Sequence, residues 1–130
     1  MIENKYTMED SLFKVKEVPA MKGTDKDTGY KFVVREDNGD ILSCMTNSYK
    51  TISNNDIMSK AEPVLAEKGA VLTDVRIFGN GSRTKWTYRL NDTKVKVAKN
   101  DYLNPEVSII NSYDGSSEAS AHGGAFRLVC

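Results

Sequence analysis

The sequence predicts an α+β fold in which a β-hairpin, one kinked helix and an antiparallel β-meander follow one another along the chain. Two turns rich in asparagine and glycine, at residues 36–40 and 79–82, each separate two segments with the composition of strands. Between these turns, residues 53–69 have the apolar spacing of a helix. The apolar runs that follow are short, which favours further antiparallel strands. We expect an extended N-terminal arm at residues 1–29 and a single α+β domain at residues 30–130.

The arm is predicted because its residues are mostly polar, and residues 22–29 have the composition of a solvated loop. The first hairpin is predicted to pair residues 30–35 with residues 41–46. An Asn-Gly pair lies between these two segments and supplies the positive φ angles that a tight turn requires.

A helix is predicted to follow the first hairpin and to end before Gly69. Three residues can cap its start: Ser53, Asn54 and Asp56. Its apolar face comprises Ile57, Ala61, Val64 and Leu65. Pro63 removes one backbone donor and crowds the carbonyl of Ser59, so we expect a kink or a break at residues 59–62.

A second hairpin is predicted to pair residues 71–78 with residues 85–90 around a turn of glycine, asparagine and serine. Alternation along these strands assigns side chains to two faces. The apolar face comprises Val71, Thr73, Val75, Ile77, Trp86, Tyr88 and Leu90. The opposite face carries Arg76, Lys85, Thr87 and Arg89.

The last part of the chain is predicted to complete the meander. In order, its elements are a strand led by Val95 and Val97, a strand at residues 107–110, a turn at Asp114-Gly115, a weak strand at residues 118–121, a loop at residues 122–124 and a strand at residues 125–130. A terminal strand exposes unpaired backbone groups and apolar side chains. We therefore expect a homo-oligomer that associates through Phe126, Leu128 and Val129. Two alternatives stay open, a truncated part of a longer protein or a shortened protein whose last strand is covered by association.

Composition places the 130 residues among globular domains, with 39% hydrophobic and 28% charged residues. No apolar stretch approaches the roughly 18 residues of a membrane span, and the first residues lack the pattern of a secretory signal. We expect a cytoplasmic protein without a membrane partner. In that compartment Cys44 and Cys130 are predicted to be reduced core thiols.

The sequence predicts no enzyme, no metal site and no cofactor. The only histidine, His122, lies beside two glycines in a predicted loop, where a histidine is usually solvated. Asp114, Ser116 and Ser117 can approach it only across the last hairpin, and such residues are more often turn formers. One histidine and two distant cysteines lack the ligand spacing of a zinc site.

The net charge of zero conceals a basic stretch, because residues 74–99 contain seven basic and two acidic side chains. A local excess of one sign attracts an anionic partner within about 8–10 Å. The candidate nucleic-acid-binding residues are Arg76, Arg83, Lys85, Arg89, Lys94, Lys96 and Lys99. The alternative is an ordinary solvated sheet face. Trp86 and Tyr88 are able to stack on bases, but alternation assigns them to the core.

Four segments, taken in order, resemble a family of phage- and plasmid-encoded proteins of unknown function. They are residues 34–42, 49–54, 111–117 and 126–130. In that family the segment similar to residues 127–130 continues into an asparagine and a helical region, where this sequence ends. The resemblance implies a mobile-element origin and a host cytoplasm. The order of helix, meander and helix is also similar to that of the phage single-strand annealing proteins, which is a fold-level analogy.

Two hypotheses from different classes follow. The first is a phage or mobile-element protein that binds single-stranded DNA, as a recombination or annealing module. The second is a non-enzymatic interaction or assembly protein of a phage, such as a host-defence antagonist or a virion-associated factor. The zero net charge and the lack of catalytic residues motivate this second hypothesis.

Overall fold

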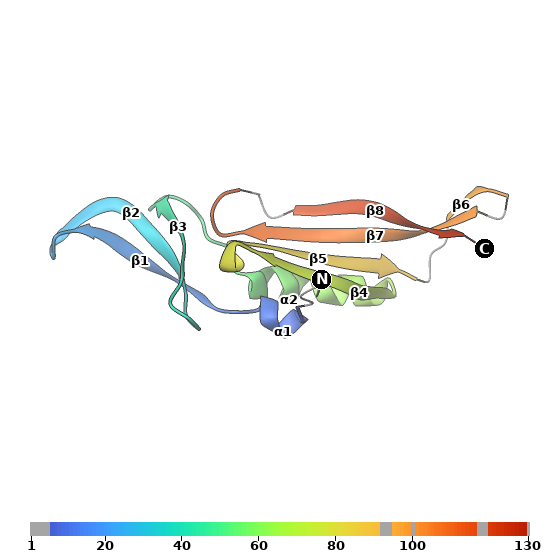
Figure 1. Ribbon diagram of the computed structural model, residues 1–130, viewed down its shortest axis with the longest axis horizontal. Helices are drawn as coiled ribbons and strands as arrows, with labels where there is room; N and C mark the ends of the chain where they lie inside the picture. Colours follow the sequence, from blue (N-terminus) through green and yellow to red (C-terminus); the bar gives the residue numbers. More distant parts are fainter. Residues whose placement is uncertain (1–5, 92–94, 100, 117–119, 130) are drawn as a thin grey trace, which may run out of the picture.

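The computed structural model describes residues 6–91, 95–99, 101–116 and 120–129. It contains two antiparallel sheets, one long helix and two short helical segments, which confirms the predicted α+β fold with a β-meander. Figure 1 shows the three-stranded sheet at one end of the molecule and the five-stranded sheet, with the helices beside it, at the other. The elements are α1 (Met8–Ser11), β1 (Val15–Lys22), β2 (Lys26–Arg35), β3 (Ile41–Thr46), α2 (Asn54–Glu67), β4 (Ala70–Phe78), the 3₁₀ turn η1 (Gly79–Gly81), β5 (Arg83–Leu90), β6 (Val95–Ala98), β7 (Asp101–Ser112) and β8 (Ser120–Val129).

The three-stranded sheet has the order β1-β2-β3. The predicted hairpin of β2 and β3 is confirmed, with Tyr30 opposite Thr46. The sequence predicts an arm up to residue 29, but residues 15–22 instead form a strand that pairs with β2 along its whole length. Residues 22–29, predicted to be a loop, form only a short turn and the adjoining ends of β1 and β2. Pairing with a neighbouring strand therefore orders a segment of mixed composition, interrupted by Pro19, that gives little strand signal on its own.

The helix α2 begins at a predicted cap, because the Ser53 hydroxyl accepts a hydrogen bond from the Asp56 backbone N–H at 3.0 Å. It ends before Gly69, as predicted. The helix continues through Pro63 without the predicted break. Pro63 and Ser59 are both exposed. Water can therefore solvate the carbonyl whose intrahelical bond the proline removes.

The strand β7 is central to the five-stranded sheet. Residues 106–112 pair with β5, residues 101–103 with β6 and residues 101–110 with β8. The strands β5 and β6 therefore share one edge of β7, and β8 occupies the other. The predicted loop at residues 122–124 is wrong, because these residues lie within β8 opposite residues 106–108. Glycines disfavour strands intrinsically, but the ladder with β7 satisfies their backbone groups.

A β-bulge at Thr73 changes the predicted faces of β4. Leu72 and Asp74 lie opposite consecutive residues of β5, so Thr73 is an extra residue in the strand. The bulge turns Leu72 toward the core and leaves Val71 49% exposed. The prediction that Val71 and Thr73 belong to the apolar face is therefore wrong, whereas Val75 is buried as predicted.

The main core lies between α2 and one face of the five-stranded sheet, which we call the inner face. Its buried residues are Met58, Leu65, Val75, Trp86, Tyr88 and Ile109. Trp86 has no exposed surface and Tyr88 is 5% exposed, which confirms their predicted place in the core. The opposite face of this sheet is called the outer face below.

A buried polar network crosses this core. The Asn54 side chain, which has no exposed surface, donates from Nδ2 to the Ser11 carbonyl at 2.9 Å and accepts from Asn111 Nδ2 at 2.9 Å. The Trp86 indole N–H donates to Ser11 Oγ at 2.8 Å. The Tyr113 hydroxyl accepts from the Asn54 backbone N–H at 2.7 Å, and burial raises the pKa of Tyr113 to about 12. These bonds link α1, α2, β5, β7 and the residue after β7 inside the core.

A second apolar cluster, made of Phe13, Val33, Leu42 and Tyr113, packs on one face of the three-stranded sheet. Cys44 lies opposite Phe32 on the other face and is exposed, so the prediction that it is a core thiol is wrong. Leu42 is an extra residue in the register of β3, and this bulge moves it to the cluster side. Cys130 lies outside the described residues.

Candidate nucleic-acid interface

The outer face of the five-stranded sheet collects most of the predicted basic residues. Cross-strand partners share a face of a sheet. The register therefore puts five of the seven on the outer face: Arg76, Arg83, Lys85, Arg89 and Lys96. Lys99 is exposed in the turn after β6. Lys94 lies outside the described residues. The core contacts of α2 are all with the inner face, so this helix does not cover the basic side chains.

Two of these cations are engaged by carboxylates of the same face. Arg76 Nε lies 2.9 Å from Asp74 Oδ2, and Arg89 Nη2 lies 3.6 Å from Glu106 Oε1. The other three, which are Arg83, Lys85 and Lys96, form no ion pair within the described part of the chain. The outer face therefore keeps a net positive charge. This charge is smaller than the net charge of residues 74–99 taken alone.

Two aromatic residues accompany the cations. Phe78 is 44% exposed and lies opposite Arg83, whose guanidinium carbon is 5.7 Å from the centre of the phenyl ring. Tyr102 lies opposite Lys96 at the other end of the face. Trp86, which has a ring able to stack on bases, is buried on the inner face. Side chains two positions apart on a strand share a face, so the spacing of Phe78 from Arg76 is the sequence signal that could have identified the exposed ring.

A row of polar residues crosses the middle of the outer face. Asp74 lies opposite Thr87, Thr87 opposite Ser108, and Ser108 opposite His122. The Thr87 and Ser108 hydroxyl oxygens are 3.3 Å apart and are hydrogen bonded. These residues come from four strands, two of which follow only after residue 100, so no local sequence motif predicts the row.

Asp114 is a turn former, as the sequence favours, and the observed register does not bring it opposite His122. His122 is paired with Ser108, and β7 continues for about 13 Å beyond Ser108 before the turn that contains Asp114. Asp114 accepts a hydrogen bond from the Ser116 backbone N–H at 2.9 Å, as a turn former does. Burial raises the pKa of Asp114, but hydrogen bonds from Ser116 and Ser82 outweigh it and the net pKa is lowered. Ser117 lies outside the described residues.

The strand β8 carries the residues predicted to mediate self-association. Phe126 is opposite Asn104 and Leu128 is opposite Tyr102, and Val129 is the last residue of the strand. Within the described residues β8 pairs only with β7, so one of its edges is open. The side chains of these three residues are not among those that the structure describes.

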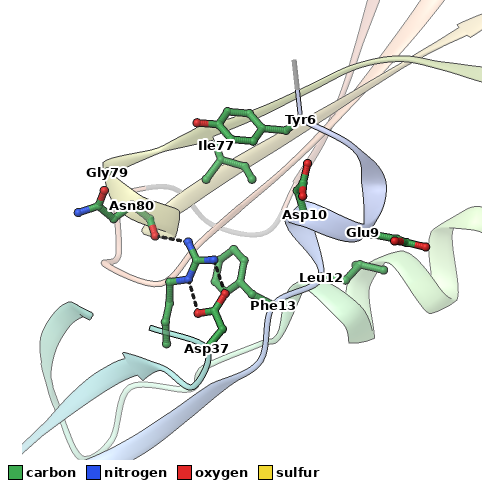
Figure 2. A pocket seen from close by; sticks show the side chains of 10 residues that line it. Tyr6, Glu9, Asp10, Leu12, Phe13, Asp37, Ile77, Gly79 and Asn80 are labelled. Atoms are coloured by element: carbon green, nitrogen blue, oxygen red, sulfur yellow. Dashed lines mark hydrogen bonds and ion pairs between the residues drawn. The ribbon is translucent and has the colours of Figure 1, made fainter. Parts of the chain in front are cut away.

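A separate cavity of about 900 Å³ opens where α1, the β2–β3 turn and η1 meet. Figure 2 shows three carboxylates around it, those of Glu9, Asp10 and Asp37, together with the aromatic ring of Tyr6. Asp10 closes the N-terminal capping box of α1, and Asp37 binds Arg35. The lining is therefore acidic overall, which is unsuited to phosphate. Of the candidate nucleic-acid-binding residues that the structure describes, none lines this cavity.

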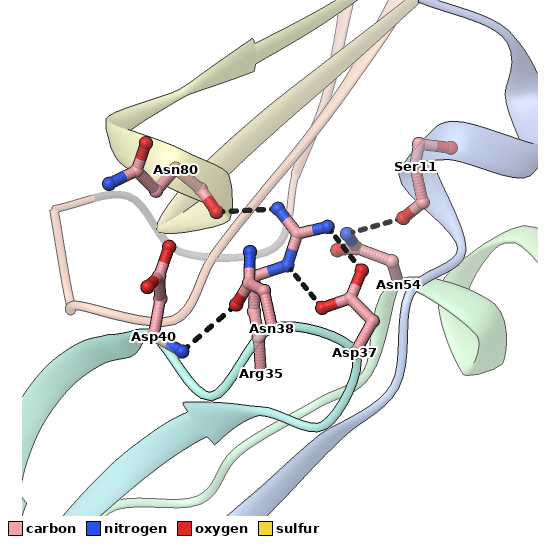
Figure 3. A network of polar contacts seen from close by, with 7 residues as sticks. All are labelled: Ser11, Arg35, Asp37, Asn38, Asp40, Asn54 and Asn80. Atoms are coloured by element: carbon pink, nitrogen blue, oxygen red, sulfur yellow. Dashed lines mark hydrogen bonds and ion pairs between the residues drawn. The ribbon is translucent and has the colours of Figure 1, made fainter.

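One wall of the cavity is formed by Arg35 and its hydrogen-bond partners, which join the two sheets. Figure 3 shows Arg35 donating from Nε and Nη2 to the two carboxylate oxygens of Asp37 and from Nη1 to the Asn80 carbonyl, at distances of 2.9, 2.6 and 2.7 Å. The hydrogen bond from Arg35 holds the pKa of Asp37 below its usual range. Gly81, with φ of 115°, permits this approach, because a Cβ there would lie 2.6 Å from Phe13 Cζ.

Within the described residues, no helix is long and apolar enough to cross a membrane, and no three or more His, Cys, Asp or Glu side chains are placed to hold a metal ion. No curated protein and no solved structure matches the chain. The model of one family, described as a domain of unknown function (DUF932), matches residues 41–130. The match begins at the first residue of β3 and includes α2 and the whole five-stranded sheet. Since it covers more than half of the sequence, the chain belongs to the DUF932 family.

Proposed function

We propose that this protein binds single-stranded DNA along the outer face of its five-stranded sheet, as a recombination or annealing module of a phage or another mobile element in the host cytoplasm. The observation that carries the proposal is the gathering of five basic side chains on a sheet face that α2 leaves uncovered. Cations along a groove or face bind the phosphate backbone without regard to sequence.

The length of the face suits a short stretch of single strand. The row of Arg83 is opposite Ser112 and the row of Lys96 is opposite Tyr102. These rows are about 33 Å apart along β7. That distance corresponds to about ten nucleotides at the duplex spacing of 3.4 Å, and to fewer in an extended strand. Phe78 and Tyr102, at the two ends, supply rings on which bases can stack.

The link to annealing rests on analogy. The helix followed by an antiparallel meander matches the first two parts of the helix, meander and helix order of phage annealing proteins, and the sequence motifs resemble phage- and plasmid-encoded proteins. Fold-level similarity raises the expectation of a shared activity but does not supply a site. The outer face is the surface on which the proposal can be tested.

Fluorescence anisotropy with labelled oligonucleotides of five to thirty nucleotides, titrated at several salt concentrations, is the direct test. Three unpaired cations predict a slope of log K against log salt of about −2, and all five predict about −3.5. Affinity should level off once the oligonucleotide exceeds about ten nucleotides per bound chain. A lack of any salt-sensitive binding would refute the proposal.

A second candidate function is assembly, and an apolar sheet face favours it. The face of the three-stranded sheet opposite the second apolar cluster carries three exposed large apolar side chains: Val18, Tyr30 and Ile41. A contiguous apolar patch of this kind commonly marks a protein interface. The open edge of β8 offers a second contact to another copy of the chain.

Size-exclusion chromatography with light scattering distinguishes the two functions. A stable oligomer without DNA favours assembly as an interaction or virion-associated protein. Oligomers that form only when an oligonucleotide is added favour annealing. A monodisperse monomer at high concentration, with or without DNA, contradicts self-association.

A further inference from the structure

One corner of the outer face carries an exposed aromatic ring. Phe78 is the last residue of β4 and is 44% exposed. The strand β4 is at the edge of the five-stranded sheet, and within the described residues no strand pairs with its free side. Tyr102, by contrast, is half-buried on the central strand β7. A ligand can therefore approach the ring of Phe78 from outside the sheet.

A cation lies beside this ring on the next strand. Arg83 is opposite Phe78 on β5, and its guanidinium carbon is 5.7 Å from the ring centre, within the reach of a cation–π contact. Within the described part of the chain, the Arg83 side chain makes no hydrogen bond and no ion pair. Lys85 is the next residue on the same face of β5, about 6.7 Å along the strand. A phosphate near the ring therefore meets two cations that no described carboxylate neutralises.

The turn between Phe78 and Arg83 is held by two hydrogen bonds from distant parts of the chain. Arg35 Nη1 donates to the Asn80 carbonyl, and the Tyr113 backbone N–H donates to the Ser82 carbonyl, both at 2.7 Å. These bonds fix the ends of the two strands from which the ring and the guanidinium project. Binding to side chains whose backbone is already ordered costs less conformational entropy.

We infer that Phe78 and Arg83 form a nucleotide subsite, in which an unpaired base stacks on the ring and the adjacent phosphate binds the guanidinium. The inference rests on the proposed function of the outer face and adds to it a selectivity for single strands over duplex. The bases of a duplex are paired and stacked on one another, and freeing one for the ring costs unpairing and unstacking free energy. Only a single strand gains the stacking contact without that cost.

Anisotropy titrations with three labelled probes test the inference: a ten-nucleotide oligo-dT, a ten-unit abasic deoxyribose phosphate strand and a ten-base-pair duplex. Phe78→Ala should bind oligo-dT about five- to tenfold more weakly than the unmodified protein, since it loses one stacked base. Its affinity for the abasic strand and for the duplex should be unchanged. The slope of log K against log salt should also be unchanged for Phe78→Ala, whereas Arg83→Gln should make it shallower by about 0.7 on both single strands.

Two variants separate stacking from a general apolar contact. Phe78→Leu keeps an apolar side chain without a ring, so it should bind like Phe78→Ala. Val71→Ala removes an exposed apolar side chain from the same strand and should bind like the unmodified protein. If Phe78→Ala weakens all three probes equally, or weakens none, the inference is wrong although DNA binding stands. If the unmodified protein binds none of the probes, the proposed function fails as well.

A second measurement uses the unmodified protein and does not depend on the folding of a variant. An oligonucleotide that contains 5-iododeoxyuridine crosslinks on irradiation to an aromatic ring stacked on the modified base. Trypsin cleaves after Arg76 and after Arg83, and Phe78 is the only aromatic residue in the peptide 77–83. Mass spectrometry should find the crosslink on this peptide. Crosslinks confined to other peptides would overturn the inference.

Discussion

The guanidinium carbon of Arg35 lies 3.9 Å from the centre of the Phe13 ring, so the cation is stacked on the aromatic face. The same guanidinium binds the Asp37 carboxylate with two hydrogen bonds and the Asn80 carbonyl with a third. Arg35 ends β2 of the three-stranded sheet, and Asn80 lies in η1 between β4 and β5. One side chain therefore joins the two sheets of the molecule.

Arg35→Ala should lower the free energy of unfolding by about 2–3 kcal/mol, because it removes a stacked cation and a charge-assisted hydrogen bond between the sheets. Arg35→Lys should lose most of the same amount, since an ammonium group cannot reproduce the planar, bidentate contact. Urea unfolding followed by tryptophan fluorescence measures both. Lys14→Ala, at an exposed position nearby, is the control and should change stability by less than about 0.5 kcal/mol.

The pairing of Arg35 with Asp37 also predicts an acid dependence. Because Arg35 lowers the pKa of Asp37 in the folded state, the carboxylate contributes stability above its unfolded pKa of about 3.9 and loses it as the pH falls through the folded value. The contribution is small, since the Asp37 side chain is 49% exposed and screened by solvent. Asp37→Asn should flatten the fall in stability below about pH 4. Asp114 also has a lowered pKa, so part of the fall should remain in the variant. Urea midpoints from pH 3 to pH 6 supply the comparison, and identical pH profiles for variant and parent would contradict it.

Asn54→Ala should lower the free energy of unfolding more than Arg35→Ala or Asp37→Asn. The substitution removes the Asn54 donor to the Ser11 carbonyl and one of the two acceptors of the Asn111 amide, which keeps only its bond to the Ile52 carbonyl, at a cost of about 3–4 kcal/mol. Asn55→Ala is the matched control, because Asn55 is the next residue of the same helical turn and is exposed. Equal thermal unfolding midpoints for the two variants would show that the buried network does not stabilise the fold.

Much of the fold could be predicted from local signals. The turns at residues 36–40 and 79–82 have sequences that few other structures tolerate, so both hairpins follow from them. The cap of α2 is likewise local, because Ser53 binds a backbone N–H three residues later. These features depend on residues that are neighbours in sequence, so they can be predicted from a short stretch of the chain.

The features that were not predicted depend on partners distant in sequence. The strand that contains His122 forms because β7 lies beside it, although two glycines follow the histidine. The bulge at Thr73 depends on the register with β5 and decides which residues of β4 face the core. The candidate interface was accordingly predicted as a set of cations, whereas the hydroxyl pair of Thr87 and Ser108 appears only when β5 and β7 are placed together.

The charge of the outer face supplies the most discriminating prediction for DNA binding. Lys85 and Lys96 form no ion pair within the described residues and lie on the outer face, so each should contribute one phosphate contact. Replacing both by glutamine should reduce the slope of log K against log salt by about 1.4 and weaken binding at low salt. The control replaces Lys60 and Lys68, which are exposed on α2 and at its end, by glutamine.

Both double variants lose the same net charge, so a general effect of protein charge would lower the two slopes equally. A loss confined to Lys85 and Lys96 locates the contact on the outer face, because α2 packs against the inner face. Arg76→Gln should have a smaller effect than Lys85→Gln, since Arg76 is already paired with Asp74. Equal slopes for the parent and the variant of Lys85 and Lys96 would exclude these residues from the interface, and circular dichroism of each variant establishes that the comparison is between folded proteins.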